Sequence, residues 1–327
     1  MTKAAHAAVR SPGNERHDPE QAPLDASDFP GCRPLRIPRE AIEDYEGRVE
    51  YWEARTETAM VVREPTTSYH ERPSHRLSRL AGFIAAARGS AIEAYGTTDL
   101  VRFDARGKPR VLMQADQILY LHPPSPEELQ PRVDIDGGSL PDVVLEVDYS
   151  TDVRVRKLPL YEAWGFPEVW VDVPDARSRR RPRSRVSALT IHVLEGGSFR
   201  AARTSRAFPG WTAEEIHRAL NEHTMSAATE AALHRVGTAL GAAEGTGPDD
   251  DPWLRRHRDE GRAEGRSAAR CKTVTALLEA RGIRTTPAFG DRFADLGELP
   301  ESDLVGAALR CENEAEFLEL CRKKGRG

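Results

Sequence analysis

Residues 140–148 have the sequence LPDVVLEVD, and this stretch decides the fold. Its apolar residues are nearly continuous, as in a β-strand that is buried on both faces of a sheet. Glu146 and Asp148 end the stretch, and the alternation of side chains along a strand places both on one face. A buried carboxylate is costly unless a cation compensates it, and Mg²⁺ prefers oxygen ligands. The stretch therefore predicts a central strand with a metal site at its end.

A second acid, Asp116, interrupts the apolar run 111–121 in the same manner. If the two strands pair, Asp116 and Glu146 converge on one metal ion. Lys157 follows near the start of the next helix, where its amine could orient or deprotonate an attacking water or neutralise charge that develops on a phosphate. Each acid alone would also suit the exposed rim of a sheet. The combination of two strands that each carry an acid, and then a lysine, favours a hydrolytic metal site.

The sequence around these residues alternates between strand and helix signals. Short strands are expected at residues 48–53, 60–63, 100–103, 111–121, 168–173, 189–194 and 198–202. Apolar residues at helical spacing predict a helix over residues 75–88, and a capping box at Thr212 and Glu215 predicts the helix that closes the domain. The pattern indicates an α/β domain with a mixed central sheet flanked by helices.

Changes in composition divide the chain into four parts. The predicted parts are a disordered leader (1–37), the α/β domain (38–225), a linker (226–251) and a helical C-terminal extension (252–327). The leader is polar and rich in Pro, Asp and Ala, and the linker prediction comes from the Gly/Asp-rich residues 241–251. The chain has 39% hydrophobic and 30% charged residues, which fits a protein whose core does not fill its whole length.

Several classes of protein are disfavoured by the composition. The sequence contains neither a membrane-spanning apolar stretch nor a signal peptide, so we expect a cytoplasmic protein with no membrane partner. Its four cysteines are widely scattered without a CxxC pair, which suggests neither a disulfide framework nor a zinc site. The formal charge of −5 disfavours a protein that coats nucleic acid through bulk charge, so nucleic-acid binding must depend on local features.

Together with Lys157 and the sequence YEAWGFPEVWVD at 161–172, the stretch 140–148 resembles the Uma-two restriction endonuclease family of the PD-(D/E)XK nuclease superfamily. The resemblance is in register over about thirty residues and extends more weakly over residues 45–216. It implies a restriction-endonuclease-like fold and an endonuclease that uses Mg²⁺, or Mn²⁺, to hydrolyse phosphodiester bonds. The implied partner is nucleic acid, in the first place DNA, and a homodimer would suit the cutting of both strands.

The resemblance also assigns roles to individual residues. Asp116 corresponds to the first acid of the superfamily and Glu146 to the second, so both would hold the metal, with Asp148 as a further ligand. The lysine that usually follows the second acid by two residues is replaced by Asp148, and the family takes this lysine from the next helix, where Lys157 stands. Because proline is tolerated only in a first helical turn, Pro159 predicts that Lys157 lies just ahead of the helix.

A competing assignment takes Asp142, in the literal Pro-Asp pair, as the first acid. Asp142 lies four residues from Glu146 on the same strand, which corresponds to about 13 Å at ~3.3 Å per residue. That separation is too large for both acids to hold one metal directly. We therefore prefer Asp116.

Other candidates remain open at this stage. Glu50 could be a further acid of the site, and His75 could contact phosphate or water, but both could equally be structural. The arginine-rich run 177–185 could grip phosphates or be a solvated loop. The leading hypothesis is a Mg²⁺-dependent endonuclease, and the alternative is a catalytically silent nucleic-acid-binding or scaffold protein that keeps the fold.

Overall fold

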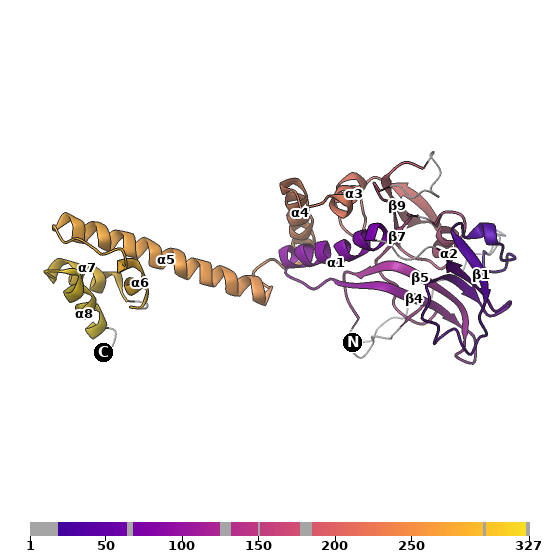
Figure 1. Cartoon of the computed structure of the whole chain (residues 1–327), viewed down its shortest axis with the longest axis horizontal. Helices are drawn as coiled ribbons and strands as arrows, with labels where there is room; N and C mark the ends of the chain where they lie inside the picture. Colours follow the sequence, from indigo (N-terminus) through magenta and orange to yellow (C-terminus); the bar gives the residue numbers. More distant parts are fainter. Residues whose placement is uncertain are drawn as a thin grey trace. The chain divides into compact units, whose positions relative to one another are not determined.

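The computed structural model describes residues 19–63, 68–124, 132–149, 151–176, 185–296 and 299–324. The chain divides into two compact units, Met1–Pro248 and Asp249–Gly327. We call them the sheet unit and the helical unit, and Figure 1 shows the elements of both.

The sheet unit is built on one mixed, mostly antiparallel sheet. Its described strands are β1 (Cys32–Arg36), β2 (Val49–Glu53), β3 (Thr58–Val62), β4 (Glu93–Phe103), β5 (Pro109–Tyr120), β6 (Val133–Asp134), β7 (Val143–Val147), β8 (Glu168–Val173), β9 (Ala188–Glu195) and β10 (Ser198–Ala202). The order is β1-β3-β2-β5-β7-β8-β9-β10, and β4 pairs with both β5 and β6. Among the described pairs, only β7–β8 and β4–β6 are parallel. The protein is therefore mixed α/β, as the sequence predicts.

Strand β7 lies inside the sheet, between β5 and β8, and all five of its residues are buried. Helix α2 (Lys157–Ala163) connects β7 to the parallel strand β8. Lys157 is the first residue of α2 rather than a residue ahead of it, so this part of the prediction was wrong. Pro159 is accommodated because it falls in the first turn, where a backbone N–H has no partner within the helix in any case.

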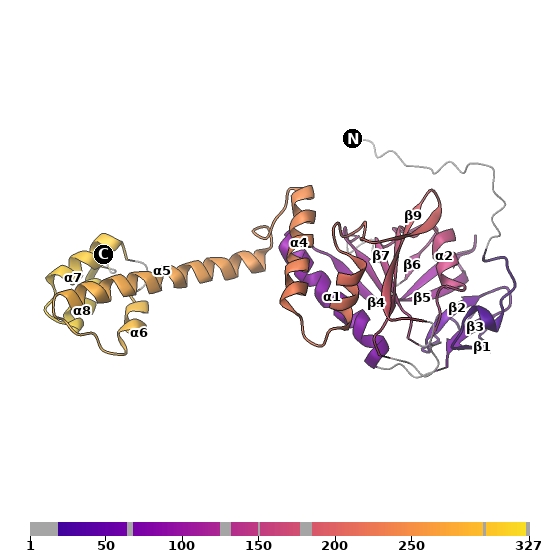
Figure 2. The same ribbon diagram turned by 90° about the horizontal axis from the view of Figure 1, so that it is seen from above.

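Helices cover both faces of the sheet. Helices α1 (Ser68–Arg88), α3 (Ala213–Asn221) and α4 (Ala227–Glu244) pack on one face, where Leu80 and Ile84 join a core with Leu145 of β7. Helix α2 packs on the other face through Leu160 and Tyr161. Figure 2 shows α1 and α4 on one side of the strands and α2 on the other.

The predicted linker 226–251 differs from the structure, because residues Ala227–Glu244 form α4. Helix α4 packs closely on α1, and its glycines make this approach possible. A Cβ atom at Gly237 would lie 2.5 Å from the carbonyl oxygen of Ile84, and one at Gly241 would lie 2.6 Å from the carbonyl oxygen of Arg88. In the sequence, glycines in this region indicated a flexible connection, whereas here they serve helix packing.

The predicted leader 1–37 also differs from the structure where its residues are described. Residues Cys32–Arg36 form β1, which pairs with β3 at the edge of the sheet. Just before it, Phe29 is buried and stacks on Tyr51 with ring centroids 5.3 Å apart. These apolar contacts order a segment whose overall composition is polar. Residues 1–18 lie outside the described part of the chain.

The helical unit comprises α5 (Pro252–Ala280), α6 (Phe289–Ala294), α7 (Glu301–Arg310) and α8 (Glu314–Lys324). It has an apolar core of its own, in which Leu278, Phe293 and Phe317 are buried. Cys311 and Cys321 belong to this core, and all four cysteines of the chain are free thiols. Among the helices that the structure describes, none is both long and apolar enough to cross a membrane.

Candidate functional site

The two principal acids face each other across neighbouring strands. Strands β5 and β7 are antiparallel, with Gln117 opposite Leu145 and Ile118 opposite Val144. One step further along this register, Asp116 lies opposite Glu146, and opposite residues project from the same face of a sheet. The backbone N–H of Val147 donates to Asp116 Oδ2 at 2.7 Å, which fixes the first carboxylate against β7.

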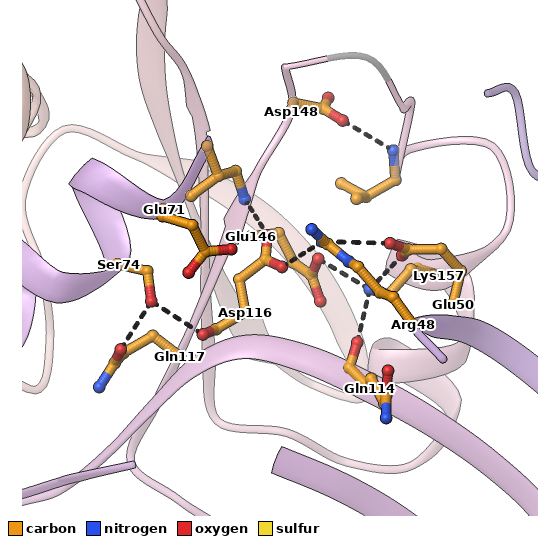
Figure 3. Close-up of polar contacts among 12 residues, drawn as sticks. Arg48, Glu50, Glu71, Ser74, Gln114, Asp116, Gln117, Glu146, Asp148 and Lys157 are labelled. Atoms are coloured by element: carbon orange, nitrogen blue, oxygen red, sulfur yellow. Dashed lines mark hydrogen bonds and ion pairs between the residues drawn. The ribbon is translucent and has the colours of Figure 1, made fainter. Parts of the chain in front are cut away.

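Lys157 joins these acids from the start of α2. Its Nζ lies 2.8 Å from Glu146 Oε2 and 2.8 Å from Glu50 Oε2, and it donates to the carbonyl oxygen of Gln114 at 2.8 Å. An ammonium group has three donors, so these contacts satisfy it fully. The lysine side chain is 2% exposed, which makes this a buried, fixed cation (Figure 3).

Arg48 closes the site on its outer side. Its Nη2 lies 2.5 Å from Asp116 Oδ1 and 3.2 Å from Glu50 Oε1, so it bridges two of the acids. The arginine side chain is 19% exposed, whereas those of Asp116 and Glu50 are 6% and 3% exposed. Arg48 is therefore the member of the group that solvent reaches most readily.

The sequence analysis did not identify Arg48 or Tyr161 as site residues. The Tyr161 hydroxyl donates to Glu146 Oε1, so both oxygens of this buried carboxylate have partners. Spacing could have revealed both residues. Arg48 precedes Glu50 by two positions, and Tyr161 follows Lys157 by four, which places the latter pair on one face of a helix.

These five residues, which we call the acid group, contain more acids than bases, because Glu50, Asp116 and Glu146 share Arg48 and Lys157. Burial raises the pKa of Glu146 to about 7, with Asp116 and Glu50 adding to the effect and Lys157 opposing it. Burial acts on Glu50 in the same direction, but Lys157 and Arg48 outweigh it and hold the pKa of Glu50 below its ordinary value. Of these two glutamates, Glu146 is therefore the one whose pKa lies near neutral pH.

The same negative neighbours act on the lysine. Burial disfavours its charged form, but Glu146 and Glu50 outweigh this and raise the pKa of Lys157 above its ordinary value. Lys157 is consequently a permanent ammonium ion at neutral pH and has no free lone pair with which to accept a proton.

The oxygen atoms of Asp116 and Glu146 would suit Mg²⁺ among the hard divalent cations. Within the described residues, no group of three or more His, Cys, Asp or Glu side chains is arranged to hold a metal ion. Mg²⁺ does not need such a cage, because proteins usually bind it through one or two carboxylates, with water and substrate phosphates as the other ligands. Asp116 and Glu146 fit this requirement, since each carboxylate oxygen can accept more than one bond.

Asp148 does not join this group. Its carboxylate accepts a hydrogen bond from the backbone N–H of Val153 at 3.1 Å and forms an ion pair with Arg185. Arg185 also lies 3.2 Å from Asp152. Asp148 thus holds one end of the predicted arginine-rich loop, whose residues 177–184 lie outside the described part of the chain.

The structure also places the other candidates. Asp142 lies at the opposite end of β7, where its Oδ2 accepts a hydrogen bond from the backbone N–H of Leu121 at 2.7 Å. His75 is exposed on α1, with its Nε2 3.6 Å from Glu71 Oε2. Of the candidate acids beyond Asp116 and Glu146, Glu50 is therefore the one that the fold brings to Lys157.

The chain matches no family model and no curated protein. What this site does must therefore be inferred from its geometry.

Proposed function

We propose that this protein is a Mg²⁺-dependent endonuclease with a restriction-endonuclease-like fold, which hydrolyses phosphodiester bonds in DNA. The observation that supports it is the convergence of Asp116 and Glu146 from neighbouring strands on a group that holds one buried ammonium and an excess of acid. Mn²⁺ would support the same reaction in place of Mg²⁺. The proposal includes action in the cytoplasm and a homodimer, which would supply two sites for cutting both strands.

Asp116 and Glu146 would hold the metal ion. When bound, Mg²⁺ supplies Lewis-acid polarisation of a phosphate and lowers the pKa of a water molecule. Lys157 is already fixed by Glu50 and by the Gln114 carbonyl oxygen, so it needs no reorganisation to act. Because its pKa is raised, its role is to neutralise negative charge on the phosphate rather than to remove a proton from water.

Cleavage of supercoiled plasmid DNA in Mg²⁺ tests the proposal with the variants Asp116→Asn and Glu146→Gln. Each should lose activity by more than about 100-fold, because loss of groups that only support metal ligands already costs roughly 10–100-fold. Asp142→Asn is the matched control, since it removes an acid on the same sheet that lies outside the group, and it should cut DNA like the wild type. Undiminished cleavage by both principal variants would refute the proposal.

One observation favours a second candidate, a catalytically silent nucleic-acid-binding or scaffold protein. The Arg48 guanidinium already contacts Asp116 at 2.5 Å and so provides a cation from within the chain. Calorimetric titration with Mn²⁺ separates the two candidates. Binding that disappears in Asp116→Asn supports the endonuclease, whereas failure to bind Mn²⁺ together with failure to cut any DNA or RNA supports the silent protein.

A further inference from the structure

A strongly basic cleft of about 500 Å³ lies beside α1, on the face of that helix that meets the turn between α3 and α4. It is lined by three arginines and two histidines, namely Arg72, Arg76, Arg79, His75 and His223. The described residues that line it include no Asp or Glu. We call this feature the α1 cleft.

The arginines of the α1 cleft are ordered by the fold. Residues 72, 76 and 79 follow one another at intervals of four and three, so they form one stripe along α1. Arg72 Nη2 donates to the carbonyl oxygen of Glu222 at 3.0 Å, and Arg76 donates to the same oxygen. This backbone acceptor positions two guanidinium groups without neutralising them.

Among the described residues, two carboxylates approach those of the cleft, and one of them is Glu71, whose Oε2 lies 3.6 Å from His75 Nε2. The nearest carboxylate oxygen of Glu222 lies 3.9 Å from Arg76 Nη2. Arg79 is exposed, and its guanidinium carbon lies 5.9 Å from the centre of the Phe83 ring. Burial, with the like charges of Arg72 and Arg79, lowers the pKa of Arg76 although Glu222 opposes the effect. The cleft thus holds several positive charges, and a bound polyanion would reduce the repulsion between them.

The same helix connects the α1 cleft to the acid group. Ser74 Oγ donates to the carbonyl oxygen of Asp116 at 3.0 Å, and Figure 3 shows Ser74 and Glu71 beside this acid. Arg72 precedes Ser74 by two residues, which is about 3 Å along the helix axis, and the two side chains leave the helix on different faces. The seven steps along the helix from Arg72 to Arg79 rise about 10 Å at ~1.5 Å per residue. Phosphates of one DNA strand are spaced ~3.4 Å apart along the duplex axis, so this length corresponds to about three phosphates.

From this placement we infer that the α1 cleft binds the phosphate backbone of the DNA strand next to the bond that is cut. The inference rests on the proposed function, because it takes its ligand from that function. It adds a substrate-binding surface on the helix that contacts Asp116 through Ser74.

Binding without cleavage tests the inference. Full-length protein is titrated into a fluorescently labelled DNA duplex in EDTA, and anisotropy gives the affinity at a series of salt concentrations. Arg72→Gln combined with Arg79→Gln should reduce the slope of log affinity against log salt by about 1.8, since each phosphate contact contributes ~0.9. If both proteins bind equally at 1 M salt, the variant binds about 60-fold more weakly at 0.1 M.

Arg33→Gln combined with Arg200→Gln is the matched control. These arginines are exposed on β1 and β10, the two ends of the sheet order, and their loss changes the net charge equally. The control should keep the wild-type slope. Because Arg72 contacts Glu222, Arg79→Glu provides a second variant at an exposed position that leaves the α3 end unchanged. Thermal melting checks that every variant is folded.

The outcomes separate the inference from the proposed function. An unchanged slope in both cleft variants, or an equal loss in the control pair, overturns the inference. So does arginine-dependent binding to phosphatidylserine vesicles without binding to DNA. DNA binding that depends on the cleft supports the inference even if no DNA is ever cut. Wild-type cleavage with unaltered binding by the cleft variants overturns the inference and leaves the proposed function standing.

Discussion

Two of the places where the sheet unit buries charge differ in their balance of acids and bases. Arg88 is fully buried and donates to the two carboxylate oxygens of Glu244 at 2.7 and 2.6 Å and to the carbonyl oxygen of Leu121 at 2.6 Å. Here one acid meets one base, and the hydrogen bonds from Arg88 lower the pKa of Glu244. In the acid group, Glu50, Asp116 and Glu146 share two cations.

This difference separates a balanced ion pair from a group with an excess of acid. The balanced pair joins the end of α1 to α4 and to the end of β5, and it has no charge left for a ligand. The acid group keeps one carboxylate, Glu146, whose pKa of about 7 makes it exchange a proton near neutrality. In the proposed function, the metal ion would take the place of this proton.

The largest effect should come from removing the buried ammonium. Lys157→Met leaves Glu50 and Glu146 buried without their shared cation, and breaking a buried ion pair from one side costs about 3–5 kcal/mol. Urea unfolding at pH 8 measures the loss. Mn²⁺ should restore part of the stability of Lys157→Met but none of that lost in Arg88→Met. A loss of less than about 1 kcal/mol in the free energy of unfolding would show that Glu50 and Glu146 are tolerated in the interior without their shared cation.

A pH effect of about 3 kcal/mol on the free energy of unfolding is expected from Glu146. Its pKa rises from 4.5 to about 7 on folding, so the folded state binds the proton more tightly than the unfolded state. The resulting stabilisation is complete below pH 4.5 and disappears as the pH rises to about 7, and 2.5 pKa units correspond to about 3 kcal/mol. Glu50, with its lowered pKa, contributes in the opposite direction only at lower pH.

Glu146→Gln stays neutral and should lack this pH dependence. Urea unfolding of the wild type and the variant between pH 4.5 and 7.5 provides the comparison, and the variant should gain on the wild type as the pH rises. Two parallel stability curves would mean that Glu146 ionises at an ordinary pKa.

A smaller loss of stability is expected when the Arg88–Glu244 pair is weakened but not removed. Arg88→Lys keeps the charge but cannot reproduce two parallel hydrogen bonds to Glu244, and a hydrogen bond to a charged group contributes about 1.5–3 kcal/mol. Thermal unfolding measures the change. Mn²⁺ binding should be unaffected. A folded variant that no longer binds Mn²⁺ would show that the acid group depends on the Arg88–Glu244 pair.

The smallest effect should follow removal of residues 249–327. The sheet unit has its own core and contains both charged regions, so its melting temperature and its Mn²⁺ binding should stay close to those of the whole chain. Calorimetry of the shortened protein is the check. A sheet unit that fails to fold alone would show that the two cores are thermodynamically dependent.

The elements that could be predicted are those with strong local patterns. The apolar run of β7 and the acid within β5 indicated both strands and their key residues. Asp148 was placed with Glu146 by strict alternation, but β7 ends at Val147 and the chain then turns, so the carboxylate accepts its bond from Val153 instead.

The features that could not be predicted depend on pairing between residues that lie far apart in the sequence. Glu50 reaches Lys157 from β2, whose pairing with β3 is irregular between Val49 and Tyr51, and no local pattern specifies such a register. Helix α4 was included in a predicted linker whose signal was the Gly/Asp-rich stretch 241–251, and only the last residues of the helix belong to that stretch. Strand β1 was similarly hidden in a polar segment, since its order comes from β3.

The close contact between α1 and α4 has a consequence for the opposite end of α1. Where a backbone lies against another with no space for a side chain, as at Gly237 and Gly241, a slip by one residue would advance α1 by about 1.5 Å and turn it by about 100°. Ser74 and the arginine stripe would then face elsewhere. Two glycines thus set the axial position and rotation of a helix whose Ser74 lies about 15–20 Å away along its axis.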